Sequence, residues 1–119
     1  MSKLLASILN TAAALLLLAS AAFADDYPNK PIRMIIPFPP GGSNDVVGRL
    51  VAKHLSDALG QQVYVDNHGG AGGTIGTEVA SKAAPDGYTL LVISLAHAVN
   101  PWLYKLPYDH EKAFVPVAS

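Results

Sequence analysis

The strongest constraint on the fold is a cycle of short apolar runs, glycine-rich loops and amphipathic stretches along the chain. Residues 32–36, 63–65 and 89–93 are short runs of mostly apolar, β-prone residues that do not alternate with polar ones. Continuous apolarity is typical of strands buried on both faces, as in a parallel sheet. Residues 46–59 and 74–83 lie between these runs and carry apolar residues at helical spacing. The strand–helix–strand–helix–strand order therefore predicts an α/β fold: a parallel sheet with flanking helices and right-handed crossovers.

The helix predicted at 46–59 has one apolar stripe, and amphipathic helices turn such a stripe toward the core. Its members recur at three- and four-residue spacing: Val47, Leu50, Val51, Leu55, Ala58 and Leu59. Gly60 then ends the helix, as glycine commonly does at this position. Arg33 interrupts the first apolar run, and we interpret it as an edge or strand-end position whose guanidinium reaches solvent. Beyond Ser94 the pattern weakens to a helical turn at 101–104 and an irregular segment at 105–119.

The first 24 residues have the pattern of a cleavable secretory signal peptide. Lys3 supplies a positive charge, residues 4–19 are almost wholly apolar, and small residues at Ala22 and Ala24 occupy the positions that signal peptidase reads. The apolar run is shorter than the roughly 20 residues of a membrane-spanning helix. The chain contains no cysteine, which excludes a lipoprotein anchor and disulfides. We predict cleavage after Ala24 and export to the periplasm, with secretion to the medium as the alternative.

The remaining residues, 25–119, have a slightly acidic composition. Without Lys3 they hold seven Lys and Arg (eight minus one) against nine Asp and Glu, a net charge of −2. This balance lacks the basic surface that nucleic-acid binding requires, so we expect no nucleic-acid partner. A segment of 95 residues (119 minus 24) is the size of one small domain.

Three loops follow the predicted strands and carry the candidate chemistry: 37–45, 66–74 and 94–100. In an open parallel sheet, ligands bind at the carboxyl ends of the strands. The first two loops are rich in glycine and lead into predicted helices, whose N-terminal N–H groups and partial positive charge attract anions. Two such loops side by side suit a small anion such as a carboxylate. The alternative is that these glycines only form tight turns.

Other kinds of site have weaker support. Gly70, Gly72 and Gly76 give G-x-G-x-x-x-G, close to a dinucleotide fingerprint, but the motif follows the second strand and no acidic residue ends the next one. Ser43 does not lie in the G-x-S-x-G elbow of a serine hydrolase. The four histidines lack the spacing of zinc ligands, and we interpret His54 as a half-buried packing residue. We therefore expect no enzyme, no metal site and no cofactor.

Four longer segments carry a pattern that is specific in combination. They are YPNKPIR (27–33), PFPPGGSND (37–45), GAGGTIG (70–76) and APDGYTLL (84–91). In this order and spacing they resemble the tripartite tricarboxylate transporter receptor family, the TctC-like or Bug extracytoplasmic solute-binding proteins. The segments HAVNP (97–101) and LPYD (106–109) look similar too, so the resemblance covers nearly all of the chain after residue 24.

The resemblance implies a periplasmic-binding-protein-like fold, in which two α/β lobes close around a ligand like a Venus flytrap. It also implies a small carboxylate ligand (a di- or tricarboxylate, an amino acid or an aromatic acid) and a membrane permease that receives it. Carried onto this chain, the family's ligand-binding positions are Phe38, Gly42, Ser43, Asn44, Asp45, Ala71, Gly72, Gly73, Thr74, Ser94, His97 and Asn100. Asp45 is expected to accept hydrogen bonds from water or to cap its helix, rather than to face the anion.

Two departures from the family pattern affect these expectations. His68-Gly69 follow Asn67 where the family carries Arg-Pro, which we expect to loosen the second loop. Family members have about 300 residues, the size of a two-domain chain, so residues 25–119 are predicted to be the N-terminal portion of the first lobe, with the second lobe absent. We therefore keep two functional hypotheses. The chain is either a monomeric carboxylate receptor or a truncated fragment without independent binding activity.

Overall fold

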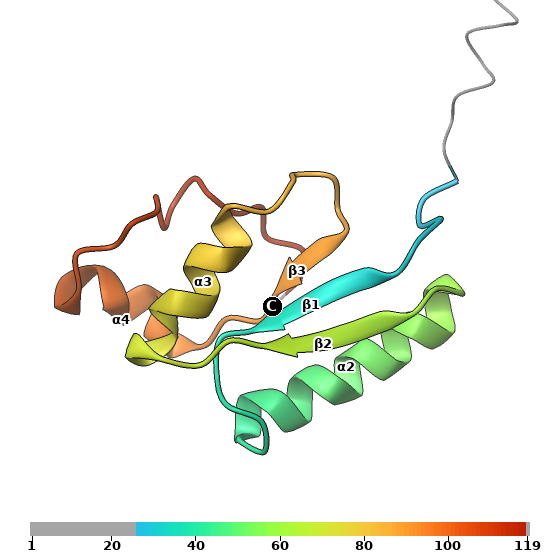
Figure 1. Ribbon diagram of the computed structural model, residues 1–119, viewed down its shortest axis with the longest axis horizontal. Coiled ribbons are helices and arrows are strands. Elements are labelled where there is room, and N and C mark those ends of the chain that lie inside the picture. Colours follow the sequence, from blue (N-terminus) through green and yellow to red (C-terminus); the bar gives the residue numbers. More distant parts are fainter. Residues whose placement is uncertain (1–25, 119) are drawn as a thin grey trace, which may run out of the picture.

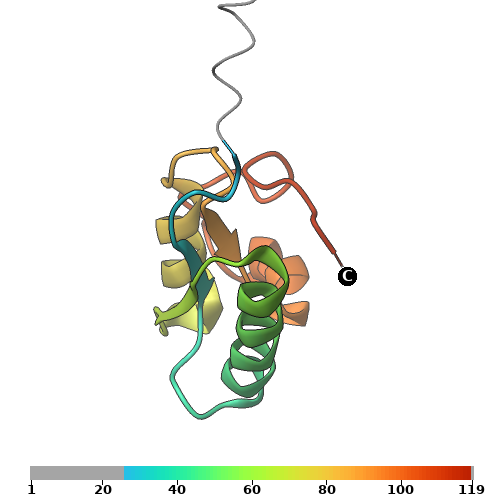
Figure 2. The ribbon, with the colours of Figure 1, turned by 90° about the vertical axis from the view of Figure 1, so that its right-hand side faces the viewer.

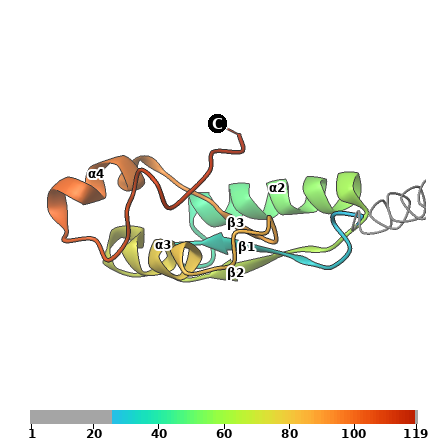
Figure 3. The same cartoon turned by 90° about the horizontal axis from the view of Figure 1, so that it is seen from above.

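The computed structural model describes residues 26–118, and the predicted signal peptide with its cleavage site lies outside them. The elements are β1 (Ile32–Ile36), α2 (Ser43–Leu59), β2 (Val63–Asn67), η2 (Ala71–Gly73), α3 (Thr74–Ser81), β3 (Thr89–Leu91) and α4 (Leu95–Leu103). Three parallel strands form one sheet in the order β2–β1–β3, with α2 on one face and α3 on the other (Figures 1 and 3). The predicted α/β fold is confirmed. Within residues 26–118, no helix has the length and apolarity needed to cross a membrane.

The central strand β1 supplies most of the core. Its residues Ile32, Ile35 and Ile36 are almost fully buried, as continuous apolarity predicted. β2 pairs with β1 from Ile32–Val63 to Ile36–Asn67, and β3 pairs on the other side. Because the three strands run parallel, their carboxyl ends and the loops that follow them meet at one edge of the sheet.

Small residues, rather than the predicted apolar stripe, bring α2 against the sheet. The buried face of the helix consists of Asp45, Gly48 and Ala52. A Cβ atom at Gly48 would lie 2.5 Å from Ile36 Cδ1, so helix and strand approach closely because residue 48 has no side chain. Most of the predicted stripe does not face the core, since Val47 and Leu50 are each 57% exposed, although Leu55 is partly buried and packs against the core. Helical spacing identifies side chains that share a face, but not the face that the sheet covers.

The end of α2 agrees with the sequence prediction. Gly60 adopts the left-handed conformation at φ 66°, and its N–H donates to the Ser56 carbonyl. The Ser56 hydroxyl also accepts a hydrogen bond from the Val63 N–H at 2.8 Å, which ties the last turn of the helix to the start of β2. His54 is exposed, so the interpretation of this residue as half-buried packing is wrong.

Arg33 lies in the central strand, so an edge position is wrong, but it is the second residue of β1 and its side chain is 30% exposed, as the strand-end alternative predicted. Its Nε donates to Asp66 Oδ2 at 2.7 Å, and its Nη2 lies 3.2 Å from His68 Nε2. Burial opposes ionisation of the Asp66 carboxyl, but hydrogen bonds from His68 and Arg33 hold its pKa below the usual value. Arg33 is tolerated in the middle of the sheet because the neighbouring strand supplies this carboxylate.

The segment after β3 is more helical than the sequence predicted. β3 ends at Leu91 instead of residue 93, and the nine-residue helix α4 follows. Ser94 caps this helix, because its hydroxyl accepts a hydrogen bond from the Ala96 N–H at 3.3 Å. The sequence predicted only a turn because Pro101, which lies inside α4, normally ends or kinks a helix. Residues 105–118 are irregular, as predicted.

Candidate functional site

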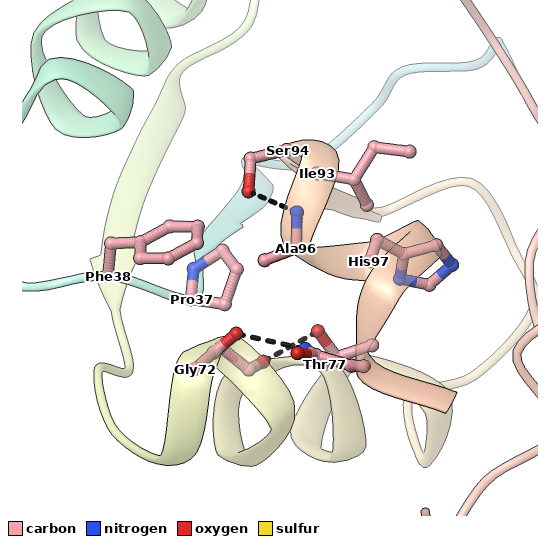
Figure 4. Close-up of a pocket in the computed structure, with 10 residues that line it drawn as sticks. Pro37, Phe38, Gly72, Thr77, Ile93, Ser94, Ala96 and His97 are labelled. Atoms are coloured by element: carbon pink, nitrogen blue, oxygen red, sulfur yellow. Dashed lines mark hydrogen bonds between the residues drawn. The ribbon is translucent and has the colours of Figure 1, made fainter. Parts of the chain in front are cut away.

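The three candidate loops meet around a small pocket at the carboxyl edge of the sheet (Figure 4). The pocket has a volume of about 10 Å³, which is room for about one water molecule. It is lined by Pro37, Phe38, Gly72, Gly73, Thr77, Ile93, Ser94, Ala96, His97 and Asn100. Six of the predicted positions are therefore brought together: Phe38 from the first loop, two glycines from the second, and Ser94, His97 and Asn100 from the third.

The first loop contributes one wall of the pocket. Pro37 and Phe38 line it, and Figure 4 shows them across from the start of α4. Gly42, Ser43 and Asn44 lie instead at the beginning of α2, with Gly42 as the N-terminal cap, and do not line the pocket. The N–H groups of a first helical turn have no acceptor within their own helix, so these three residues offer donors beside the pocket rather than in it.

Asp45 is buried at the base of the first loop, where it holds the loop in place. Its carboxylate accepts hydrogen bonds from the Gly41 N–H at 2.9 Å, from Arg49 Nε at 3.0 Å and from Asn67 Nδ2 at 2.9 Å. The hydrogen bonds from Arg49, Gly41 and Asn67 lower the pKa of Asp45 to about 2. As expected, Asp45 accepts hydrogen bonds and does not line the pocket, but its donors are protein groups.

The second loop has a backbone that glycine makes possible. Gly72 and Gly73 have φ values of 64° and 92°, a region that side chains other than glycine seldom adopt. A Cβ atom at Gly72 would lie 3.3 Å from Asn100 Oδ1, so the loop also needs glycine for its approach to α4. Ala71 and Thr74 do not line the pocket. They stabilise the loop, because the Thr74 hydroxyl donates to the Ala71 carbonyl at 2.9 Å.

The third loop is the start of α4, which closes the pocket opposite Phe38. Asn100 is only 4% exposed, and its Nδ2 donates to the Gly72 carbonyl at 2.9 Å, which joins α4 to the second loop. His97 Nδ1 is buried and has no hydrogen-bond partner among residues 26–118. The His97 ring packs edge-on against Phe114, with ring centroids 5.8 Å apart.

The pocket is polar without being charged. None of the ten described residues that line it is Asp, Glu, Lys or Arg. The backbone N–H groups of Gly73, Ala96 and His97 already donate to protein acceptors, which leaves the side chains of Thr77, Ser94, His97 and Asn100 as its polar groups. Such neutral donors stabilise an anion through hydrogen bonds and the helix dipole. No group of three metal-binding side chains occurs between residues 26 and 118.

Several residues of this edge were not predicted. Thr77, Pro37, Ile93 and Ala96 line the pocket, and Asn67 joins the base of the first loop. The sequence signal for Thr77 was its position four residues, about one helical turn, after Gly73. In the structure its hydroxyl donates to the Gly73 carbonyl at 2.7 Å. Pro37 and Asn67 were detectable by the rule that ligands bind at the carboxyl ends of strands.

Comparison with known proteins decides the family. A sequence profile described as "Tripartite tricarboxylate transporter family receptor" (TctC) matches residues 47–119. The chain belongs to this family. Protein BugT of Bordetella pertussis is 48% identical over 104 residues, which cover 85% of this chain and 32% of BugT.

Solved TctC-family structures give the same result for the fold. The periplasmic binding protein BugD is 44% identical with a TM-score of 0.71, and the match covers 74% of this chain and 30% of BugD. MatC from Rhodopseudomonas palustris, solved with bound malate, is 39% identical with a TM-score of 0.71, and the match covers 76% of this chain and 32% of MatC. The chain thus spans about a third of the length of the TctC relatives that it matches.

Proposed function

We propose that this chain serves as an extracytoplasmic solute-binding receptor for a small carboxylate, which it delivers to a membrane permease of the tripartite tricarboxylate type. One observation carries the proposal: a glycine-rich loop and the start of α4 converge on an uncharged polar pocket at the carboxyl edge of the sheet. Membership of the receptor family supports it. The proposed role is binding, with no catalytic step and no cofactor.

The proposed site holds a carboxylate through neutral donors. Gly72 takes one side, and Ser94, His97 and Asn100 take the other. Ala71 and Thr74 stand outside the lining, and the N–H groups of Gly73 and Thr74 hold the loop by donating to the carbonyls of Gly70 and Ala71. Each hydrogen bond to a charged group contributes about 1.5–3 kcal/mol net. Phe38 forms the apolar wall, and the donors at Gly42, Ser43 and Asn44 act through ordered water because they stand outside the pocket lining.

The ligand class follows from the relatives and from the size of the pocket. MatC was solved with malate, a dicarboxylate, and we propose that this chain takes a di- or tricarboxylate, an amino acid or an aromatic acid. A pocket of about 10 Å³ has room for about one water molecule, so it would enclose no more than one carboxylate oxygen of such a ligand. Sites that enclose a whole small molecule have about 300–1,000 Å³. The rest of the acid would then contact further chain, such as the TctC relatives carry.

The proposed setting is the periplasm. Residues 1–24 act as a signal peptide that is removed after Ala24, and residues 25–119 form the N-terminal portion of the first solute-binding lobe. The working receptor is a monomer that meets its permease in the membrane. The length of the relatives supports the assignment to one part of a lobe, because the chain spans about a third of each.

Calorimetric titration of the purified chain tests this function. We expect heat of binding with at least one of malate, citrate, glutamate and benzoate, and none with glucose, because a neutral sugar cannot use the helix-start donors as an anion does. Binding of glucose with no response to any acid would overturn the proposal. No binding to any solute, together with a non-cooperative thermal transition, would favour the second hypothesis, a truncated fragment without independent binding activity.

Two matched glycine variants locate the site. Gly60→Ala and Gly72→Ala introduce the same Cβ at φ values of 66° and 64°, so each costs about 1 kcal/mol in backbone strain. A Cβ at residue 60 contacts nothing within 4 Å, whereas one at residue 72 meets Asn100 Oδ1. We expect Gly72→Ala to weaken acid binding at least tenfold and Gly60→Ala to leave the dissociation constant within twofold. Equal effects on binding would place the ligand elsewhere.

A further inference from the structure

A half-buried side-chain amide at the end of β2 joins the first two loops of the proposed site. Asn67 is the last residue of β2 and lies opposite Ile36, the last residue of β1. The first loop leaves β1 at this point and the second loop leaves β2. One side chain at this position can therefore reach both.

The hydrogen bonds of Asn67 go to the first loop and to the helix that follows it. Its Nδ2 donates to the Phe38 carbonyl at 3.1 Å and to Asp45 Oδ1 at 2.9 Å, which uses both of its hydrogens. Its Oδ1 accepts from Arg49 Nη2 at 3.0 Å. A side chain needed only to end a strand would not require three partners outside the sheet.

Asp45, one of the two acceptors of the Asn67 amide, is itself held in place by other hydrogen bonds. Asp45 is 4% exposed and also accepts hydrogen bonds from the Gly41 N–H and from Arg49 Nε. The amide of Asn67 thus donates to two acceptors, the Phe38 carbonyl and the Asp45 carboxylate, which stand at the two ends of the segment 38–45. Phe38 lines the pocket, so the position of its carbonyl bears directly on the proposed site.

We infer that Asn67 is a positioning residue, which sets the distance between the Phe38 wall and the glycine-rich loop that begins one residue after it. This inference rests on the proposed function, because that function makes the distance important. Asn67 does not line the pocket and does not contact the ligand. It acts through the Phe38 carbonyl, and the required chemistry is a side-chain donor at residue 67.

The first test replaces the donor with a group of equal shape. In Asn67→Asp the new carboxylate at residue 67 cannot donate to the Phe38 carbonyl and faces the carboxylate of Asp45. We expect malate affinity to fall about tenfold at pH 7.5, the loss of one such hydrogen bond. Two groups act on the introduced carboxyl: the Asp45 carboxylate raises its pKa, and Arg49, whose Nη2 lies 3.0 Å from Asn67 Oδ1, lowers it. A second measurement near pH 5 shows which of the two prevails, because only the protonated carboxyl donates again. Asn29→Asp, which adds the same charge at an exposed residue bonded to Tyr88, should change affinity less than twofold at either pH.

An exchange variant separates positioning from folding. Asp45→Asn with Asn67→Asp keeps one amide and one carboxylate in the cluster, so the pair can bond in the reverse direction and Arg49 keeps an anionic partner. We expect thermal stability to recover toward that of the unsubstituted chain while malate affinity stays about tenfold low, because the Phe38 carbonyl still lacks its donor. Recovery of both properties would overturn the inference and leave Asn67 a purely structural role.

Failure of this inference and failure of the proposed function give different results. Amide NMR signals of Phe38, Gly41 and Gly42 report the first loop without any ligand. We expect Asn67→Asp to shift these signals and Asn29→Asp to leave them in place. Unshifted signals overturn the positioning role whether or not acids bind. If the signals shift but the unsubstituted chain binds none of the acids, the positioning role stands and the proposed carboxylate function fails.

Discussion

At the scale of single residues, Asp45 shows how a predicted site position can serve the structure of the site rather than the ligand. Its pKa of about 2 lies below the roughly 3.9 of an unfolded aspartate, chiefly because Arg49, Gly41 and Asn67 donate to the carboxylate. A lowered folded-state pKa gives stability that is present above the unfolded pKa and is lost as the pH falls through the folded one. The contribution of Asp45 should therefore disappear between about pH 4 and pH 2.

Asp45→Asn tests this expectation. We expect the variant to be less stable than the unsubstituted chain at pH 6, and the difference in unfolding free energy to shrink as the pH falls from 4 toward 2. Urea unfolding at pH 6, 4 and 3 measures it. Asp57→Asn is the matched control, because Asp57 forms an exposed pair with Lys53 on the same helix, and exposed pairs contribute at most about 1 kcal/mol. A difference for Asp45→Asn that is independent of pH would contradict the assignment.

At the scale of the elements, the sequence predicted the presence and order of the strands and main helices, but not how they pack. Apolar runs and helical spacing were sufficient for β1, α2 and α3, because those patterns follow from local geometry. The buried face of α2 was missed, since close packing selected Gly48 and Ala52 over larger apolar side chains. α4 was missed because Pro101 argues against a helix at this point and the segment has no polar face that would give it an amphipathic pattern. In the structure Ser94 caps this helix.

The candidate site was predicted to a similar degree. The strand-end rule and the family resemblance selected three loops, and half of the positions carried over line one pocket. Gly42, Ser43 and Asn44 were indistinguishable in sequence from pocket residues because the direction in which the loop leaves β1 is a tertiary property. Asn67 was missed for the same reason, since its partners lie 22 and 29 residues away in sequence.

The contact between α2 and β1 gives a prediction at this scale. In Gly48→Val the added side chain must displace Ile36, whose Cδ1 lies 2.5 Å from the Cβ position. Such overpacking costs about 1–3 kcal/mol, which chemical unfolding would detect. Val47→Ala changes the next residue, which is 57% exposed, and should stay within about 0.5 kcal/mol of the unsubstituted chain. Equal stabilities for the two variants would show that α2 does not approach the sheet through residue 48.

At the scale of the whole molecule, many large apolar side chains of the described residues are exposed. Four residues of α2, Val46, Val47, Leu50 and Val51, are 61%, 57%, 57% and 44% exposed, and Figure 2 shows this helix at the surface of the molecule. A large apolar groove of about 1,120 Å³ adjoins this side, between the sheet and the segment 110–118. Extended apolar patches of this kind promote association or mark surfaces that pack against other polypeptide.

The exposed side of α2 leads to a prediction about solubility and stability together. Val47→Gln with Leu50→Gln should raise the concentration at which the chain self-associates, measured by sedimentation velocity, because both side chains lose apolar contact area. The free energy of unfolding should change by less than about 1 kcal/mol, since neither residue lies in the core and surface substitutions stay within about 0.5 kcal/mol each. Ile36→Ala, at a fully buried residue of β1, should cost about 2–5 kcal/mol in the same assay. A large loss of stability in the double glutamine variant would contradict this and would mean that this side of α2 is covered in solution.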